Sequence, residues 1–575
     1  MKSPITVSLI AICLTGSVCF AQRGARGGNQ PQAAASREDA LDPTPINPAA
    51  DPNVDMFIND YKNSQPRMIY GRLAVRDILT KLEGSDPQHP TKKGAVLTSI
   101  TAISYATLAP GAISSGRMQA GERIVFYATG GTGQITVNSK TADVHKGTGF
   151  TLTPDFDFKL SNTGQAPLTF YTRTEPVPTN SVPNADLVVF QRFENDRRVG
   201  AHWAHINNGG PAGLTVINIA PRTMPQPHSH PQEECWIMIE GETILSLGKQ
   251  ILRMTAGQAY KIPPTGITAH SNLNLGDETV EMIYLGPADR GAAGALGGAA
   301  PAGGGAGRDY GRLENGSYNR PTEQDIDMFI GNWRDSFPRM MHGNLYMRDM
   351  LTALQGSDSL HPTRRGAVLV DSEAVSFAQL EPGASAHRIE GELKGIQQTF
   401  IVNSGNGVIT SGSKKVELTK DMAFIITPAM DFKLTATGDK YMTFYVVSEK
   451  LPQGFTPETT LEVVDNRGKA QVTNNWVNRE RPLIAKADGL SQYGAINQVE
   501  MNSMTMSRPY SADKNVEEIW IATEGDIDIL LGKELRKIPV GTAFRVPSTG
   551  ITAHAQINAS GKPAKFISID SKREN

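Results

Sequence analysis

The amino-acid sequence contains one long pattern twice. The first copy begins at Asp55 and reads DMFINDYKNSQPRMIYGRL; the second begins at Asp327, 272 residues later, and reads DMFIGNWRDSFPRMMHGNL. Further along, EECWIMIEG and PTGITAH recur as EEIWIATEG and STGITAH in the second half. A period this long indicates two halves of several domains each, because solenoid repeats have periods of about 20–50 residues. The second half must therefore repeat the fold of the first.

The 575 residues of the chain correspond to three to five domains, at about 150 residues per domain. After an opening segment, each half shows short apolar runs separated by Gly and Pro, a pattern typical of an all-β domain. The opening segments, Asp55–Glu83 and Asp327–Gln355, are predicted to be helical instead. Their apolar residues fall near helical spacing, and Gly84 follows as a stop signal.

These patterns predict the domain order along the chain. We expect a signal peptide over residues 1–21, a disordered segment over 22–50, a helical segment with a first barrel over 51–178, a second barrel over 179–290, a Gly/Ala-rich linker over 291–322, a helical segment with a third barrel over 323–452, and a fourth barrel over 453–575. The Gly/Ala-rich linker cannot bury apolar area, so it is predicted to act as a flexible tether.

The N-terminus has the features of an export signal. Lys2 is followed by the mostly apolar stretch Ile5–Phe20, and a small-x-small cleavage pattern ends at Ala21. We therefore expect the protein to be periplasmic or extracellular. Cleavage after Ala21 leaves Cys235 as the one cysteine of the mature chain, so no internal disulfide is expected.

Net charge restricts the partners. The formal charge is −2, and no basic patch of the kind that binds nucleic acid or an anionic membrane is evident. The apolar part of the signal is too short to predict a membrane span. GGTGQ at residues 130–134 lies between predicted strands, so we expect a hairpin turn and no nucleotide-binding loop. A small-molecule partner is expected, and a homo-oligomer remains open.

Two phrases carry candidate metal ligands. PHSHPQEECWIMIEG contains His228, His230 and Glu234, and GQAYKIPPTGITAHSNLN contains His270. On an unbroken strand, side chains alternate faces with a period of two, so the three even-numbered residues of the first phrase share one face. Three imidazoles and one carboxylate that converge suit a borderline divalent metal.

These phrases resemble the two signature motifs of the cupin superfamily. The resemblance implies a small double-sheet barrel of the jelly-roll type, and hence an all-β chain of tandem barrels. It also implies that His228, His230, Glu234 and His270 bind one divalent transition metal. The resemblance favours manganese or iron, and zinc, nickel and copper remain alternatives. The strong match covers residues 195–290, under a quarter of the chain.

The duplication gives an internal comparison for this set of ligands. The fourth barrel keeps the acid and one imidazole, and it lacks the other two histidines. At an offset of 284 the pairs are Glu234 and Glu518, His270 and His554, His228 and Ala512, and His230 and Lys514. We therefore expect one metal per chain. In the fourth barrel, the Lys514 ammonium is expected to lie beside Glu518 in place of a metal ion. The first and third barrels contain no H-x-H motif, and His387 is read as a lone histidine.

Other residues are candidates for catalysis. Arg222 shares the parity of the ligands and could hold a substrate carboxylate. His202 and His205 precede the metal motif in AHWAH and are absent from the matching NNWVN of the second half. The alternative for these two is an exposed pair flanking a core tryptophan. Trp236 is expected to pack in the barrel wall and Glu233 to face outward, and the parity of Cys235 predicts a buried thiol on the outer face.

Two functions remain in competition. The first is an exported metal-dependent enzyme of the dioxygenase, decarboxylase or isomerase type that acts on a small oxygenated molecule. Four protein ligands on a six-coordinate metal leave two positions open for water, dioxygen or substrate, as such chemistry requires. The alternative is a non-catalytic protein that binds a small molecule or a metal, and three degenerate barrels of four favour it.

Overall fold

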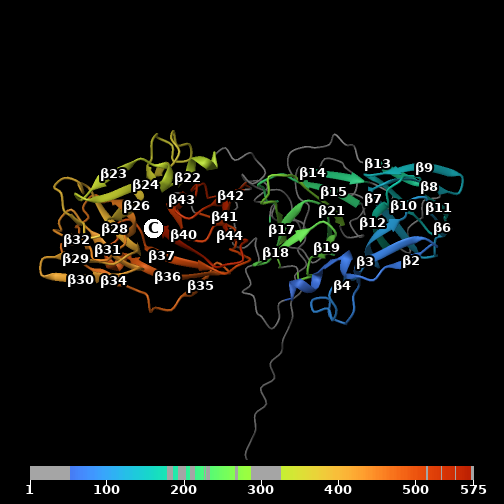
Figure 1. The fold of residues 1–575 in the computed structure, drawn as a ribbon, viewed down its shortest axis with the longest axis horizontal. Helices are drawn as coiled ribbons and strands as arrows, with labels where there is room; N and C mark the ends of the chain where they lie inside the picture. Colours follow the sequence, from blue (N-terminus) through green and yellow to red (C-terminus); the bar gives the residue numbers. More distant parts are fainter. Residues whose placement is uncertain are drawn as a thin grey trace, which may run out of the picture. The chain divides into compact units, whose positions relative to one another are not determined.

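The structure is a computed structural model of the chain. It describes residues 52–177, 186–191, 202–206, 214–225, 227, 233–265, 268, 270–285, 325–512, 514, 516–532, 534–550 and 552–571. The predicted signal peptide, the predicted disordered segment and most of the linker lie outside these residues. Within them the chain forms mainly antiparallel sheets with a few 3-10 turns, so the all-β fold class is confirmed (Figure 1).

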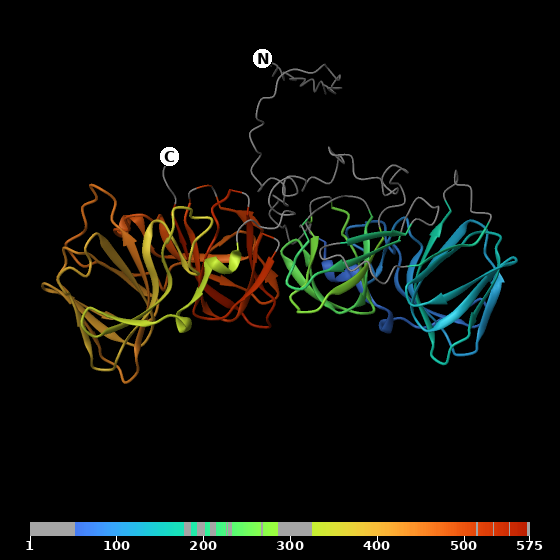
Figure 2. The same ribbon diagram turned by 90° about the horizontal axis from the view of Figure 1, so that it is seen from above.

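The first barrel has two facing sheets, coloured blue to cyan in Figure 2. The large sheet has the order β13 (Val188–Gln191), β10 (Thr148–Leu152), β7 (Glu122–Gly130), β12 (Leu168–Pro176), β5 (Ala102–Leu108), β3 (Leu73–Lys81) and β2 (Arg67–Ile69), with β4 (Ala95–Leu97) parallel to β3. The small sheet has the order β6 (Ile113–Arg117), β11 (Asp157–Asn162), β8 (Thr132–Val137) and β9 (Lys140–His145). The hairpin turn expected at residues 130–134 is wrong: a turn at Gly131 connects β7 to β8, but these two strands belong to different sheets.

The second barrel repeats this plan with a strand from outside it. Its large sheet has the order β1 (Ile58–Asp60), β19 (Gln258–Lys261), β16 (Cys235–Glu240), β21 (Val280–Leu285), β15 (Leu214–Ile219) and β14 (His202–Ile206). Facing it are β20 (His270–Leu273), β17 (Glu242–Leu247) and β18 (Gln250–Thr255). Two 3-10 turns, η2 (Val54–Phe57) and η3 (Tyr61–Asn63), flank β1.

The second half has the same two barrels. The large sheet of the third barrel has the order β23 (Pro338–Met341), β24 (Leu345–Ala353), β26 (Ser372–Leu380), β33 (Met442–Lys450), β28 (Ile396–Ser404), β31 (Met422–Ile426) and β34 (Val463–Asp465), with β25 (Ala367–Leu369) beside β24. The small sheet that faces it has the order β27 (Ser385–His387), β32 (Lys433–Ala436), β29 (Gly407–Ser411) and β30 (Lys414–Leu418). The fourth pairs β22 (Ile330–Asn332), β43 (Thr542–Arg545), β40 (Glu518–Glu524), β45 (Ala564–Asp570), β37 (Ala495–Met501), β36 (Asn478–Ala485) and β35 (Val472–Asn474). Opposite them lie β38 (Thr505–Met506), β44 (Ala553–Asn558), β41 (Ile527–Leu531) and β42 (Glu534–Ile538), and β39 (Tyr510–Ser511) pairs with β44.

Strand alternation gives each half three apolar layers. On β7, Phe126 points into the first barrel and stacks on Phe150, while Val125 and Tyr127 point out. The outward residues do not meet solvent, because they pack against the outer face of the second barrel around Cys235. Cys235 is fully buried there, which confirms the expected outer-face thiol. The two barrels of a half therefore share one continuous packed unit.

An ion cluster is buried on the outer face of the large sheet of the first barrel. Glu175 on β12 accepts a hydrogen bond of 2.5 Å from Arg123 Nε and forms an ion pair with Arg173. All three side chains are less than 10% exposed. One carboxylate thus serves two buried guanidinium groups, an arrangement in which removal of the carboxylate is costly.

The helices expected over Asp55–Glu83 and its second copy are wrong beyond the short 3-10 turns. On β3, Leu73 and Val75 point into the first barrel, whereas Ile78 and Leu79 pack between the barrels. The change of face follows from a register shift just before Leu79 in the pairing of β3 with β5. A bulge of this kind gives apolar residues a spacing that imitates a helix.

The opening segment of each half contributes to the second barrel of that half. Ile58 on β1 pairs with Tyr260 on β19, and the side chains of Val54 and Ile58 join the core of the second barrel. Ile330 pairs with Phe544 in the second half in the same way. The segment that precedes the first barrel thus completes the sheet of the next one.

Candidate metal centre in the second barrel

Glu234 and His270 meet inside the second barrel. Glu234 directly precedes β16, and His270 is the first residue of β20, so the two sheets each supply one group. His270 Nε2 lies 3.1 Å from Glu234 Oε1, and both side chains are 1% exposed. Trp236 Nε1 donates a hydrogen bond of 2.8 Å to the same oxygen. A buried carboxylate and an imidazole from the two sequence motifs are therefore adjacent.

The backbone and the neighbouring side chains fix this pair. The N–H of Ile262 donates to the carbonyl of Glu234 at 3.0 Å, and His270 on β20 is paired with Leu247 on β17. Trp236 packs in the barrel core, as expected, and its ring lies parallel to that of Tyr260 with centroids 6.4 Å apart. Trp236 thus has a second role that the sequence did not predict, since its indole also orients the Glu234 carboxylate.

Two of the four predicted ligands, His228 and His230, lie outside the described residues. Among the residues that the structure describes, no three His, Cys, Asp or Glu side chains gather as a candidate ion site. His202 and His205 lie on β14, which is separated from β16 by β15 and β21. Their backbone belongs to the described part of the chain, but their side chains do not.

Arg222 lies elsewhere than the sequence predicted. Its backbone is left-handed, with φ of 55°, and its guanidinium Nε forms an ion pair of 3.0 Å with Asp277. The shared face was inferred from an unbroken strand, but β16 begins only at Cys235. The parity argument therefore does not extend back to Arg222.

Glu233 was expected to face outward; it does so with respect to the second barrel, but it is buried from solvent. Its side chain does point away from the interior of the second barrel, but the first barrel covers that face. Its carboxylate accepts hydrogen bonds from the N–H of Thr98 at 2.8 Å and of Ser99 at 2.6 Å, and Lys261 Nζ lies 3.6 Å away. Burial raises the pKa of Glu233, but Lys261 and these donors lower it to below its ordinary value, so the carboxylate is charged.

The fourth barrel contains the same acid–imidazole pair with an added donor. His554 Nε2 lies 2.9 Å from Glu518 Oε1, and Trp520 Nε1 donates to this oxygen at 2.7 Å. Tyr510 donates its hydroxyl to the same oxygen at 2.6 Å, and its ring centroid lies 4.0 Å from that of His554. Three donors therefore converge on one carboxylate oxygen.

The predicted role of Lys514 is wrong, because its side chain is exposed and takes no part in this cluster. Burial raises the pKa of Glu518, but the charge of His554 and the hydrogen bonds lower it below its ordinary value. Burial and the nearby Glu518 carboxylate raise the pKa of Tyr510 well above its usual range, so its hydroxyl stays protonated and donates. A phenol occupies the position where the sequence suggested an ammonium.

The strand register identifies the matching positions of the first barrel. Phe158 pairs with Val137 just as His270 pairs with Leu247. Six residues separate Ile124 from Gly131, as six separate Glu234 from Gly241. An apolar pair, Ile124 and Phe158, thus stands where the second barrel has its acid and imidazole. Both side chains belong to the core of the first barrel.

The third barrel has a polar cluster that the sequence analysis missed. Gln398 stands at the position of Glu234 and contacts His342 Nε2 at 2.7 Å through Oε1. Glu392 lies 3.2 Å from Nδ1 of the same ring, whose side chain is 1% exposed. Burial lowers the pKa of His342 below its ordinary value, so the imidazole is neutral near pH 7. The available signal was the repeat itself, in which His342 replaces Tyr70.

The tripeptide His-Pro-Thr occurs at residues 89–91 and again at 361–363. His89 Nδ1 lies 2.7 Å from Asp86, and His361 Nδ1 lies 2.6 Å from Asp358, in each case within an exposed turn. These contacts join residues three apart, so each imidazole contacts a carboxylate of its own turn.

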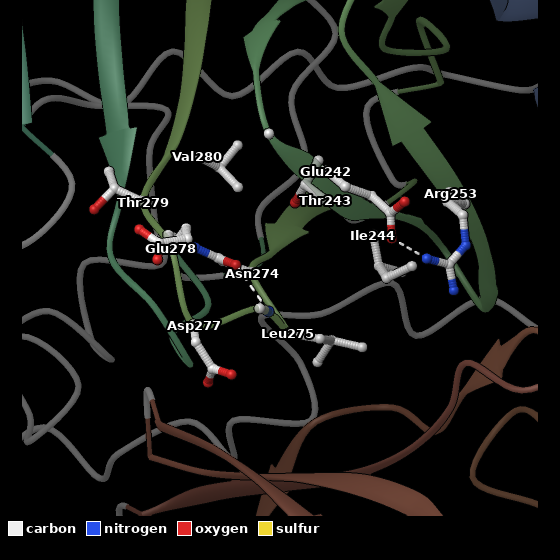
Figure 3. A pocket seen from close by; sticks show the side chains of 12 residues that line it. Glu242, Thr243, Ile244, Arg253, Asn274, Leu275, Asp277, Glu278, Thr279 and Val280 are labelled. Atoms are coloured by element: carbon white, nitrogen blue, oxygen red, sulfur yellow. Dashed lines mark hydrogen bonds and ion pairs between the residues drawn. The ribbon is translucent and has the colours of Figure 1, made fainter.

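A surface cavity of about 360 Å³ lies at the far end of the β17–β20 pair from His270. Figure 3 shows that Asn274, Asp277 and Glu278 line one side of it, and that Glu242 and Arg253 form an ion pair on the other. In the register of β17 and β20, Ile244 pairs with Leu273 beside the cavity, and Leu247 pairs with His270. The cavity is therefore distinct from the acid–imidazole pair.

Residues 215–286, which lie in the second barrel, match the family model described as a cupin domain, in agreement with the resemblance of the two sequence motifs to the cupin superfamily. No curated protein matches the sequence. AerE from Microcystis aeruginosa is similar over 40% of this chain and 98% of its own, with 13% identity and a TM-score of 0.32. Bacillus subtilis oxalate decarboxylase is similar over 40% of this chain and 77% of its own, with 14% identity and a TM-score of 0.32. At these scores neither likeness carries an argument about activity.

Within the described residues, the structure has no helix with the length and hydropathy that a membrane crossing requires.

Proposed function

We propose that the second barrel binds one divalent transition metal through Glu234 and His270, together with His228 and His230. The observation that carries this proposal is the contact of 3.1 Å between two side chains that are each 1% exposed and come from opposite sheets. A carboxylate buried in an apolar barrel is costly unless positive charge or several donors compensate it. A divalent ion would supply that charge.

The fourth barrel supports this proposal by contrast. There the carboxylate of Glu518 has three donors on one oxygen, and the phenol of Tyr510 is the addition. The second barrel has the imidazole and the indole at the equivalent positions, and its sequence supplies the two further histidines. In this proposal, an ion would help to stabilise the buried acid of the second barrel, as the phenol of Tyr510 helps to stabilise that of the fourth.

The donor set fits manganese or iron, with zinc, nickel and copper as alternatives, because imidazole and carboxylate suit all of these ions. Such an ion would act as a Lewis acid and as a template for a chelating oxygen substrate. The contribution of the chain is to orient Glu234 through the Trp236 indole and to surround the pair with an apolar wall. We propose a metal-dependent enzyme of the dioxygenase, decarboxylase or isomerase type that acts on a small oxygenated molecule.

A second function is a non-catalytic binding protein. The observation in its favour is the loss of the acid–imidazole pair in the first barrel, where Ile124 and Phe158 occupy both positions. The first barrel keeps the fold without this pair, so the fold does not depend on the acid and the imidazole. We further propose that the protein is exported and begins at Gln22 after cleavage; N-terminal sequencing of the protein from its native cell tests this.

Elemental analysis of the purified full-length chain tests the metal proposal. We expect about one transition metal per chain in the wild type and loss of that metal in the double variant His228→Ala/His230→Ala. The matched control is His554→Ala, which changes the equivalent imidazole of the fourth barrel and should leave the metal content unchanged. Metal retained by the double variant, or lost in the control, contradicts the assignment.

Turnover separates the two functions. Oxygen uptake and carbon dioxide release are measured with a panel of hydroxy acids, flavonoids and diketones, using protein with its full metal content. A rate that disappears in the double variant supports the enzyme. Saturable binding without turnover supports the binding protein.

A further inference from the structure

The first barrel contacts the strand that carries the candidate ligand. The carboxylate of Glu233, next to Glu234 in the chain, accepts the N–H groups of Thr98 and Ser99 at 2.8 Å and 2.6 Å. It also accepts hydrogen bonds from the hydroxyls of these two residues. Thr98 and Ser99 belong to the first barrel, in the segment between β4 and β5. One carboxylate of the second barrel is thus held by four donors of the first.

Lys261 joins the two barrels at the same place. Its ammonium donates to the carbonyl of Val96 in the first barrel at 2.5 Å and lies 3.6 Å from Glu233. Lys261 pairs with Cys235 across β19 and β16, and the N–H of the next residue, Ile262, donates to the carbonyl of Glu234 at 3.0 Å. The contact therefore reaches the backbone of Glu234 from both sides.

The second half has an equivalent contact. Glu517 accepts the N–H of Val370 at 2.6 Å and that of Asp371 at 3.3 Å, and Arg545 Nε lies 3.4 Å away. Arg545 stands where the first half has Lys261, and it donates to the carbonyl of Ser359 at 3.1 Å. This contact docks the third barrel on the fourth, beside an acid whose site is completed by a phenol.

We propose that Glu233 and Lys261 are positioning residues for the metal, and that the degenerate first barrel serves to hold the Glu234 strand in its binding geometry. This inference rests on the proposed metal site. Neither residue touches the ion in this view, and each acts through the backbone on either side of Glu234. The first barrel then has a task that needs no ligands of its own.

The competing explanation is that the contact only docks two barrels. Docking alone predicts that its loss lowers stability and leaves metal affinity unchanged. Positioning predicts that metal affinity falls as well, because partners outside the ligand shell set ligand geometry and typically change affinity by about 10- to 100-fold. The equivalent contact of the second half separates these explanations, because Glu517 docks the third barrel on the fourth, where no metal is predicted.

The experiment compares Glu233→Gln with Glu517→Gln in the full chain. Manganese(II) affinity is measured by competition with a chelator, and the bound ion is followed by its electron paramagnetic resonance spectrum. We expect Glu233→Gln to weaken manganese(II) binding about tenfold and to alter the spectrum. Glu517→Gln should lower the urea midpoint while leaving both metal readouts at their wild-type values.

Ser99→Ala provides a milder variant in case Glu233→Gln does not fold. It removes one hydroxyl donor from the first barrel and changes nothing in the second, so a smaller loss of manganese(II) affinity in the same direction is expected. Wild-type affinity and spectrum in both folded variants would overturn the positioning role. Failure of the wild type to bind a metal would instead contradict the proposed function, so the two failures are distinguishable.

Discussion

Replacing Tyr510 by phenylalanine isolates the hydroxyl that completes the fourth barrel. The hydroxyl donates to a charged acceptor, Glu518 Oε1, at 2.6 Å, while the ring stays packed against His554. A hydrogen bond to a charged group contributes about 1.5–3 kcal/mol. Since His554 and Trp520 remain as donors, the carboxylate is not left unpaired, and we expect a loss of about 2 kcal/mol.

The pH dependence has a defined sign. The pKa of Glu518 lies below its ordinary value, so this group contributes stability that is present above the unfolded pKa, about 4.3, and is lost as pH falls through the folded pKa. Tyr510→Phe removes one cause of the lowered pKa. The difference in the free energy of unfolding between wild type and variant should therefore be largest near pH 7 and should decrease at acidic pH.

Hydrogen exchange reports this change locally. For peptides that cover β40 and β44, a loss of about 2 kcal/mol corresponds to exchange about 30-fold faster when the barrel opens locally. Tyr70→Phe is the matched control, because among the described residues the Tyr70 hydroxyl donates to the thioether of Met118 at 3.2 Å, which is a weak acceptor. Equal effects of the two substitutions, or a Tyr510 effect that is the same at pH 7 and pH 3, would refute the reasoning.

Three further predictions concern the described residues. Glu175→Gln should destabilise the protein by about 3–5 kcal/mol in urea denaturation, because it removes the carboxylate that the buried Arg123 and Arg173 share; a loss below about 1 kcal/mol would contradict the ion cluster. Burial raises the pKa of the Cys235 thiol, so it should react with a disulfide reagent only after unfolding, and rapid reaction of native protein argues against this. Lys514→Ala should leave the urea midpoint unchanged, since its side chain is exposed; a clear shift would restore the predicted role of its ammonium.

The sequence predicted the features that depend on pattern within one strand or on the repeat. The all-β class and the burial of Cys235 are confirmed, whereas the turn near residues 130–134 joins two different sheets and is not a hairpin. The two motifs correctly indicated that Glu234 and His270 would meet, because each lies at the start of a strand of a facing sheet. Whether a metal binds there stays a prediction.

The errors have physical causes that one strand cannot reveal. Glu233 points out of the second barrel, as its parity predicts. It is nevertheless buried, because the first barrel covers that face. Arg222 was placed by parity as if on a continuous strand, but its own backbone is left-handed. A bulge before Leu79 gave β3 an apolar spacing close to that of a helix. Each error concerns either a packing partner or an irregularity of the backbone. The alternation of side chains along a strand predicts neither of these.

The position of β1 has a consequence for how this chain is divided. A fragment that starts at the predicted boundary of the second barrel, residue 179, would lack β1 and leave β19 as an open edge with unpaired backbone groups. It would also lose Val54 and Ile58 from its core. The smallest piece able to keep the Glu234 site intact is therefore a whole half, and shortened versions that begin at the barrel itself invite edge-to-edge aggregation.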